Sequence, residues 1–427
     1  MNPFTRIVLP VTVALVVAST SFAAPAKPAS PNKKTAKPVA MKTAAIRPFV
    51  DAPHDNVTIE WWYVNSQITT EKGRHLALIG SFFRFGNGAG QMAKDSSAST
   101  PRSHYLIWAI TDKDSKTHQA YSLADRNTLE MMKQFVTLRM LMNPNDTRAS
   151  AMLDTLSKDA FPPPTVLLDG PATVSKAPFA VAFGSGDTLT PVAGKPLTYT
   201  VKFTDLKTGV VAANLQFEAA KPAMYVGGTG NTGLRDPEDM KYLSLTRCKV
   251  TGTVDTGAGP ERITAADGWF DHQWGDTWTT QSAGWDWWGA QLADGTDILF
   301  FRQRDLATGK VFFPLATFMD KAGKLTVTKN IRFDEDLSTL WTSPATGVSY
   351  PLNWTVAFPD QHLILKISPD VREQEMPIIT GGSIWEGSCA VEAAKGDGTK
   401  VGGTAYMELV GYNSPAVKRL MKAGAAK

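Results

Sequence analysis

Apolar and polar residues alternate with a period of two along most of this chain, and short turn sequences interrupt the alternation. Successive side chains of a strand point to opposite faces of a sheet, so the pattern indicates strands with one buried face. The interruptions have the composition of hairpin turns: Glu71-Lys72-Gly73, Asp294-Gly295, Lys321-Ala322-Gly323 and Gly396-Asp397-Gly398. The sequence therefore predicts a mainly β protein with antiparallel strands.

One segment departs from this alternation and predicts two helices. Residues 127–130 (Asn-Thr-Leu-Glu) have the form of a helix N-terminus and open a helix to about Met142. Asp146 is placed to cap a second helix, which extends to about residue 158. Five of the fourteen methionines lie between Met131 and Met152. The insert therefore either packs against a barrel as an amphipathic hairpin or forms an adaptable lid over an apolar ligand.

A hairpin in the first half of the chain has a counterpart in the second half. Trp61-Trp62-Tyr63 precedes a strand that ends in Phe82-Phe83-Arg84, and Trp287-Trp288-Gly289 precedes one that ends in Phe300-Phe301-Arg302. Two copies of one hairpin imply two related β domains, and closed barrels use many strands without open edges. We expect an N-terminal domain over residues 51–238 with the helical insert at about 127–158, a C-terminal domain over 239–413 and a basic tail over 414–427.

The first fifty residues have the composition of an export signal followed by a spacer. An apolar run over residues 7–18 is too short to span a bilayer, and Ser21-Phe22-Ala23 closes it with mostly small residues. This predicts a signal peptide over 1–23, a disordered Ala/Pro/Lys linker over 24–50 and a soluble periplasmic or secreted protein without a stable membrane anchor. The formal charge of +4 comes from this basic end, so the folded part has no sign of a nucleic-acid partner.

The sequence offers little support for a cofactor or a metal ion. The six histidines lack the close spacing of a zinc motif. Cys248 and Cys389 lie in different predicted strands and either pair in an oxidising compartment or remain buried thiols. Residues 228–233 match a dinucleotide-binding loop, but the following Leu-Arg-Asp-Pro cannot open the helix that this motif requires. We therefore expect no cofactor and no metal site.

Half of the twelve tryptophans lie within twenty residues and beside ionisable side chains. The cluster comprises Trp269, Trp274, Trp278, Trp285, Trp287 and Trp288, interleaved with Asp271, His272, Asp276 and Asp286. Two or three such rings would suffice for a core, so the cluster predicts an aromatic-walled cavity into which ionisable groups point. A structural role for the acid and the imidazole is the alternative.

Strand parity divides this cluster between two faces. Trp269, Asp271 and Gln273 share one face, and Phe270, His272 and Trp274 share the other, so one of Asp271 and His272 faces a barrel interior. Acids beside indoles are costly to bury unless they are hydrogen-bonded or take part in chemistry. The same arrangement recurs where Asp286 shares a face with Trp288, Glu60 with Trp62, and Tyr406 with Glu408.

Six segments in order along the chain resemble the AttH/carotenoid 1,2-hydratase (hydroxyneurosporene synthase) family. They are Glu60-Trp61-Trp62-Tyr63, residues 242–247, residues 269–275, Gly284-Trp285-Asp286-Trp287, Trp385-Glu386-Gly387 and residues 403–412. The resemblance runs from about Asp51 to Tyr412 and implies two lipocalin-like antiparallel β-barrels packed side by side. Members of this family are usually exported bacterial proteins, and some are encoded with ABC export components.

The hydratases of that family add water to a terminal carotenoid double bond without a cofactor, and some fungal relatives promote pericyclic cyclisations. By this resemblance, His272 and Trp274 lie at the reactive end and Asp271 or Asp286 is the acid. The acid protonates the alkene, and indole faces and a carboxylate stabilise the cation that water captures. The chain departs from the family in its longer helical insert and in Gln273, which stands where a glutamate is common.

Two hypotheses for the function follow. The first is an exported protein that binds an apolar isoprenoid or acyl ligand, with ABC transporter components as potential partners. The second is a cofactor-free lyase that protonates and hydrates an alkene. The candidate catalytic residues are Asp271, His272 and Asp286, and the candidate ligand-binding residues are Trp62, Trp269, Trp274, Trp285, Trp288, Glu60, Tyr406 and Glu408.

Overall fold

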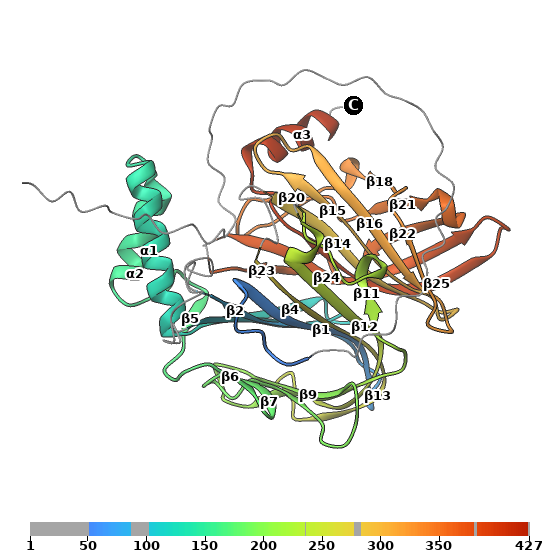
Figure 1. The fold of residues 1–427 in the computed structure, drawn as a ribbon, viewed down its shortest axis with the longest axis horizontal. Helices are drawn as coiled ribbons and strands as arrows, with labels where there is room; N and C mark the ends of the chain where they lie inside the picture. The colour runs from blue at the N-terminus through green and yellow to red at the C-terminus, as the bar shows by residue number, and fades with distance from the viewer. Residues whose placement is uncertain (1–50, 87–101, 235, 277–282, 380–381, 426–427) are drawn as a thin grey trace, which may run out of the picture.

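The computed structural model describes residues 51–86, 102–234, 236–276, 283–379 and 382–425. The expected signal peptide, the expected linker and Trp278 lie outside these residues. The described chain forms two large curled sheets that are antiparallel apart from one short parallel pair, with two helices on one flank (Figure 1). The mainly β class and the two-barrel architecture expected from the sequence are confirmed, each barrel being a curled half-barrel sheet.

The first sheet has thirteen strands. Strand β1 lies at its centre, between β2 and β13, and β12 follows β13 on the side away from β1. The strands are β1 (Ile59–Thr70), β2 (His75–Phe85), β3 (Ser103–Asp112), β4 (Thr117–Ala124), β5 (Thr165–Leu167), β6 (Thr173–Lys176), β7 (Phe179–Ala182), β8 (Thr188–Pro191), β9 (Thr198–Thr204), β10 (Val211–Ala219), β11 (Met224–Tyr225), β12 (Met240–Val254) and β13 (Glu261–Gly275). The 3-10 helices η2 (Val226–Gly228) and η3 (Pro237–Asp239) lie between β11 and β12.

The second sheet has ten strands, and a separate two-stranded sheet accompanies it. Its strands are β14 (Ala283–Leu292), β15 (Asp297–Asp305), β16 (Val311–Met319), β17 (Leu325–Thr328), β18 (Arg332–Glu335), β21 (Trp354–Phe358), β22 (Leu363–Pro369), β23 (Glu375–Pro377), β24 (Ser383–Lys395) and β25 (Lys400–Leu409). The small sheet pairs β19 (Trp341–Thr342) with β20 (Ser349–Tyr350), and the 3-10 helices are η4 (Leu337–Thr339) and η5 (Pro359–Gln361). In the segment expected to be a basic tail, helix α3 (Pro415–Ala425) buries Val417 and Met421 in the second-sheet core.

The two sheets repeat one arrangement of strands. β1 lies between β2 and β13, and β14 lies in the same way between β15 and β25. Glu60 pairs with Arg84 across the first hairpin, and Asp286 pairs with Arg302 across the second. The hairpins proposed from the sequence therefore have equivalent places and registers.

The change from the first sheet to the second falls between β13 and β14, later than residue 238, where the sequence analysis placed a domain boundary. Strands β12 and β13 follow residue 238 and still pair with β10 and β1 of the first sheet. The repeated hairpin identifies the first strands of each half. It does not show which later strands complete the first sheet, so the sequence did not locate the end of that sheet.

Two helices form where the sequence predicted them. Helix α1 (Arg126–Met142) is capped by Asp125, whose side chain accepts the amide hydrogen of Thr128, and α2 (Thr147–Ser157) is capped by Asp146. Leu129 and Met132 of α1 pack into the apolar layer between the two sheets, which matches the packing interpretation of the methionine-rich insert. None of the helices among the described residues is long and apolar enough to cross a membrane.

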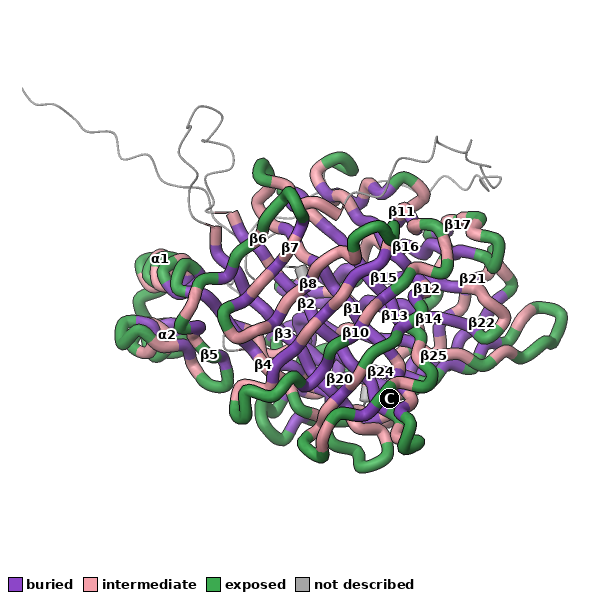
Figure 2. The backbone as a smooth tube through the Cα atoms, turned by 90° about the horizontal axis from the view of Figure 1, so that it is seen from below, coloured by how far each residue is buried: buried purple, intermediate pink, exposed green. Residues whose placement is uncertain are grey.

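The buried apolar residues, which are among those purple in Figure 2, belong to three hydrophobic clusters. The first-barrel core lies inside the first sheet, the second-barrel core lies inside the second sheet, and the layer that we call the seam lies between them and extends under α1 and α2. Cys248 belongs to the first-barrel core and Cys389 to the second-barrel core, and both are free thiols. The disulfide considered from the sequence is therefore not formed.

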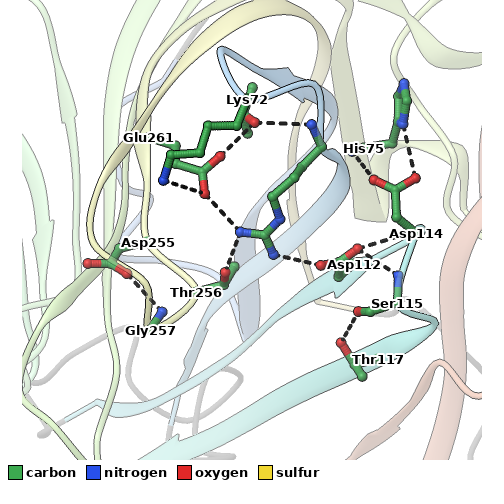
Figure 3. Close-up of polar contacts among 12 residues, drawn as sticks. Lys72, His75, Asp112, Asp114, Ser115, Thr117, Asp255, Thr256, Gly257 and Glu261 are labelled. Carbon is green, nitrogen blue, oxygen red and sulfur yellow. Dashed lines mark hydrogen bonds and ion pairs between the residues drawn. The ribbon is translucent and has the colours of Figure 1, made fainter.

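Ion pairs tie the β1–β2 turn to the start of β13. Glu261 accepts hydrogen bonds from Thr70 Oγ1 at 2.7 Å and from Lys72 Nζ at 3.4 Å. Figure 3 shows the contact between Lys72 and Glu261. Arg74 bridges Glu261 and Asp112 at 3.0 and 2.6 Å. Because Lys72 is exposed and Arg74 is partly exposed, these pairs fix the end of the sheet and contribute little stability each.

Candidate functional site

The structure distributes the predicted site residues over three places. Because the central strands alternate their side chains, neighbouring residues fall into different layers. Glu60, Trp62, His272 and Trp274 lie on the first-barrel side, Asp286 and Trp288 in the second barrel, and Trp269, Asp271, Trp285, Tyr406 and Glu408 in the seam. The alternation predicted for this strand is confirmed. Of Asp271 and His272, it is His272 that faces a barrel interior, and Asp271 faces the seam.

Asp271 is the centre of a hydrogen-bonded group in the seam. Its carboxyl accepts from Tyr242 Oη at 2.8 Å and from Trp269 Nε1 at 2.6 Å, and it is only 2% exposed. Trp287 Nε1 in turn donates to Tyr242 Oη at 3.0 Å. Burial raises the pKa of Asp271 to about 7, although the hydrogen bonds from Tyr242 and Trp269 oppose the shift. A carboxyl with this pKa holds and releases a proton at neutral pH.

Glu386 and Glu408 face each other in the same layer. They are direct partners on β24 and β25, and each also lies close enough to other seam acids for electrostatic repulsion. Burial first, and then the neighbouring negative charges, raise the pKa of both carboxyls. Tyr63 hydrogen-bonds to Glu386, yet Glu386 Oε1 is buried without a hydrogen-bond partner among the described residues.

The seam is not sealed on every side. Asp271 and Glu386 are buried, whereas Glu408 on β25, Trp61 on β1 and Trp285 on β14 keep partial exposure. Tyr406 is buried beside them and belongs to the same apolar layer. Acids with raised pKa values, indoles and tyrosines that lie next to one another, some of them partly exposed, suit proton transfer to an apolar molecule.

The first barrel contains a second, chemically different group. Glu60 is fully buried and accepts from His54 Nδ1 at 2.8 Å, from His272 Nε2 at 3.0 Å and from Arg84 Nη1 at 3.2 Å. Although burial raises its pKa, the hydrogen bonds from His272 and His54 lower the pKa of Glu60 to about 2. His54, Glu60 and His272 are also the side chains that could hold a metal ion in the described chain.

The second barrel contains a third group, built from arginines. Asp286 accepts from Arg302 Nε at 2.6 Å, from Arg304 Nη2 at 2.8 Å and from Tyr412 Oη at 2.8 Å. Burial raises its pKa, but the charges of Arg304 and Arg302 outweigh burial and lower the pKa of Asp286 overall. Trp288 stacks on Phe300 in the same core with ring centroids 5.0 Å apart.

Several residues of these groups were not among the sequence candidates, and four of them show why. Tyr242 and Glu386 stood within segments that carried the family resemblance, but nothing in the sequence paired Tyr242 with Asp271 or Glu386 with Glu408. His54 and Arg84 reach Glu60 from positions outside the tryptophan cluster. The sequence argument against a metal site used only the spacing of histidines along the chain. His54 and His272 are far apart in the sequence, but the fold brings both to Glu60, which spacing does not report.

A protein-family model and a curated relative match this chain. A family model described as AttH-like matches residues 168–412. The dehydratase asqC of Emericella nidulans is 30% identical over 173 residues, which cover 38% of this chain and 48% of that protein. The chain thus spans about half the length of this curated relative.

Two solved structures share the fold. Protein NE1406 of Nitrosomonas europaea, provisionally assigned to AttH, superposes with a TM-score of 0.63 and 19% identity over 87% of this chain and 99% of that chain. Kievitone hydratase of Nectria haematococca superposes with a TM-score of 0.52 and 14% identity over 84% of this chain and 93% of that chain.

Proposed function

Because the chain belongs to the AttH-like family, we propose that it is a cofactor-free lyase that adds water to, or removes water from, an apolar substrate in the seam. The observation that carries this proposal is Asp271, a buried carboxyl with a pKa of about 7. General acids and bases work best when their pKa lies near the working pH. The names of a dehydratase and a hydratase among the similar proteins support the reaction class.

In the hydration direction, the protonated Asp271 carboxyl transfers its proton to one carbon of an alkene. The C=C π bond breaks, a C–H bond forms and the other carbon becomes a cation, while Asp271 becomes a carboxylate. The faces of Trp269 and Trp287 stabilise this cation. Water then forms the C–O bond, and its surplus proton returns to Asp271, so that the product is an alcohol and the enzyme is restored.

The neighbours of Asp271 suit both halves of this cycle. Tyr242 and Trp269 each donate a hydrogen bond to Asp271, and such bonds stabilise the carboxylate that remains after proton transfer. Glu386 and Glu408, whose pKa values are also raised, stay protonated more readily than ordinary glutamates. Asp271 is assigned as the proton donor because Tyr242 and Trp269 both direct hydrogen bonds at its carboxyl. Dehydration of an alcohol follows the same steps in reverse.

The resemblance implied that His272 and Asp286 also take part, and these roles remain predictions. His272 faces the other side of β13 from Asp271, and Asp286 bonds to two arginines in the second-barrel core. Neither side chain shares the seam with Asp271. The proposal therefore assigns proton transfer to Asp271 and leaves His272 and Asp286 outside the reacting layer.

The test is the uptake of isotopically labelled water, measured by mass spectrometry, with lycopene and kievitone as the first probes. We expect the wild-type protein to add labelled water to an alkene probe, and D271N to lose the reaction at least about a hundredfold. D276N is the matched control. Asp276 directly follows β13, is exposed, and accepts a hydrogen bond from the backbone amide of Thr58. Equal turnover by D271N and D276N would contradict the assignment.

The second candidate function is binding of an apolar isoprenoid or acyl ligand without turnover, in an exported protein that works with ABC transporter components. The favouring observation is the apolar lining of the seam, to which Met131, Met140 and Met152 of the helical insert contribute. Flexible thioether side chains adapt to irregular apolar ligands. This alternative predicts that lycopene quenches tryptophan fluorescence equally in the wild type and in D271N, while the mass of the probe stays unchanged.

A further inference from the structure

Three donor atoms converge inside the first barrel, on the opposite side of β13 from the seam. Glu60 Oε1 lies 2.8 Å from His54 Nδ1 and 3.0 Å from His272 Nε2. The three donor atoms all lie within 4.8 Å of one another. Neighbouring ligands of an ion bound at about 2.1 Å lie roughly 3 Å apart, so these separations match a set of metal ligands.

The two imidazoles are held in position by indole rings. Trp274 stacks on His54 with ring centroids 4.2 Å apart and an interplanar angle of 6°. Trp62 stacks on His272 at 5.0 Å and 16°. Such stacking restricts rotation of the imidazoles, which keeps their nitrogens directed at Glu60. A binding site that is already oriented loses less entropy when a ligand arrives.

The second oxygen of Glu60 has its own partners. Arg84 Nη1 lies 3.2 Å from Glu60 Oε2, and the backbone amide of His54 donates to both carboxylate oxygens, at 3.0 Å to Oε2 and 3.1 Å to Oε1. These contacts orient the carboxylate in the way that outer-shell hydrogen bonds orient metal ligands. Arg84 also pairs with Asp55, so its charge is balanced without Glu60 Oε1. Oε1 is the oxygen that both imidazole nitrogens contact.

We propose that His54, Glu60 and His272 form a binding site for a divalent transition-metal ion such as Zn²⁺. Two imidazole nitrogens and one carboxylate oxygen favour zinc or iron over magnesium and calcium, which prefer oxygen ligands. Three protein ligands also leave coordination positions for water or a small molecule. The side chains of Glu60 and His272 are fully buried and that of His54 is 27% exposed, so an ion reaches the site from the side of His54.

The test is Zn²⁺ binding to the untagged, full-length protein after dialysis against a chelator, measured by isothermal titration calorimetry. We expect one ion per chain and a higher melting temperature with Zn²⁺. H54N should weaken binding at least about tenfold, because it removes one ligand while its amide can still donate to Glu60. His54 is the ligand of choice for substitution because its partial exposure lets the variant fold.

H75N is the matched control. His75 is an exposed histidine 3.1 Å from the Asp114 carboxylate (Figure 3), so it reports adventitious binding by a histidine–carboxylate pair. Equal affinity of H75N and the wild type, together with weaker binding by H54N, supports the site. Co²⁺ binding with visible absorption bands that H54N lacks supports it as well. No Zn²⁺ binding by the wild type, or equal binding by the wild type and H54N, overturns the proposal.

Discussion

The two barrels bury a carboxylate at the same place in the repeat but surround it with different groups. Glu60 and Asp286 occupy equivalent positions, each opposite an arginine, Arg84 or Arg302, in the neighbouring strand. Around Glu60 the other partners are the imidazoles of His54 and His272, and around Asp286 they are Arg304 and Tyr412.

The two carboxylates therefore differ in what their partners can do: histidine can change its protonation or bind a metal ion, and arginine cannot. Arginine keeps its proton at any physiological pH, so the Asp286 group is a permanent ion-pair network. Histidine gains and loses protons near neutral pH and also binds metal ions. The repeat thus retained the carboxylate in both barrels, but only the partners of Glu60 give the first barrel chemistry beyond structural support.

We expect the largest loss of stability from a substitution in the second barrel. D286N leaves Arg302 and Arg304 buried without their shared carboxylate, which we expect to cost about 3–5 kcal/mol of unfolding free energy. Urea denaturation followed by tryptophan fluorescence measures this loss. A loss below about 1 kcal/mol would break the comparison, because the arginines would then not depend on Asp286.

A pH-dependent effect is expected for the seam. The pKa of Asp271 rises from 3.8 to about 7 on folding. Between these values the unfolded state releases the proton and the folded state keeps it, so stability falls as the pH rises through this window. Relative to D271N, the wild type should lose up to about 4 kcal/mol between pH 4 and pH 8.

The control for this prediction is D286N, because the pKa of Asp286 is lowered in the folded protein. Its contribution to stability is lost only as the pH falls toward and below the ordinary aspartate value. The stability difference between the wild type and D286N should therefore stay constant from pH 5 to pH 8. A constant difference for D271N over the same range would show that Asp271 is ionised in the fold.

We expect a smaller loss of stability from the equivalent substitution in the first barrel. E60Q removes the carboxylate from His54 and His272, but Arg84 keeps its ion pair with Asp55, and the new amide can still hydrogen-bond to the imidazoles. We expect a loss of about 1–3 kcal/mol in urea denaturation. K72A, which removes an exposed ion pair at the end of the sheet, is the near-zero reference. A loss for E60Q as large as that for D286N would make the two carboxylates equivalent.

The fold was largely accessible from the sequence because it follows local rules. Alternation, turn residues and the capping residue Asp146 predicted strands and helices close to where they lie. The hairpin repeat identified β1 and β14 as equivalent strands. The place where the chain leaves the first sheet was not accessible, since pairing of β13 with β1 joins residues far apart in the sequence.

The candidate site was only partly accessible, for the same reason. Strand parity correctly separated Asp271 from His272, because parity is a local property of β13. The alternation of side chains does not show which layer of the protein each face of a strand packs against. The residues expected to line one cavity therefore lie in three layers. The partners Tyr242, Glu386 and His54 come from other strands and segments, and only the assembled sheets bring them to the acids.

The measurement that tests the central claim most directly is the protonation state of Asp271 at neutral pH. Infrared spectroscopy detects a protonated carboxyl by its C=O stretching band, and the difference between the wild type and D271N isolates the signal of Asp271. We predict a band that is present at pH 6 and disappears as the pH rises past about 7. A wild-type spectrum without this band at pH 6 would show that Asp271 is an ordinary ionised carboxylate and would contradict the proposed proton transfer.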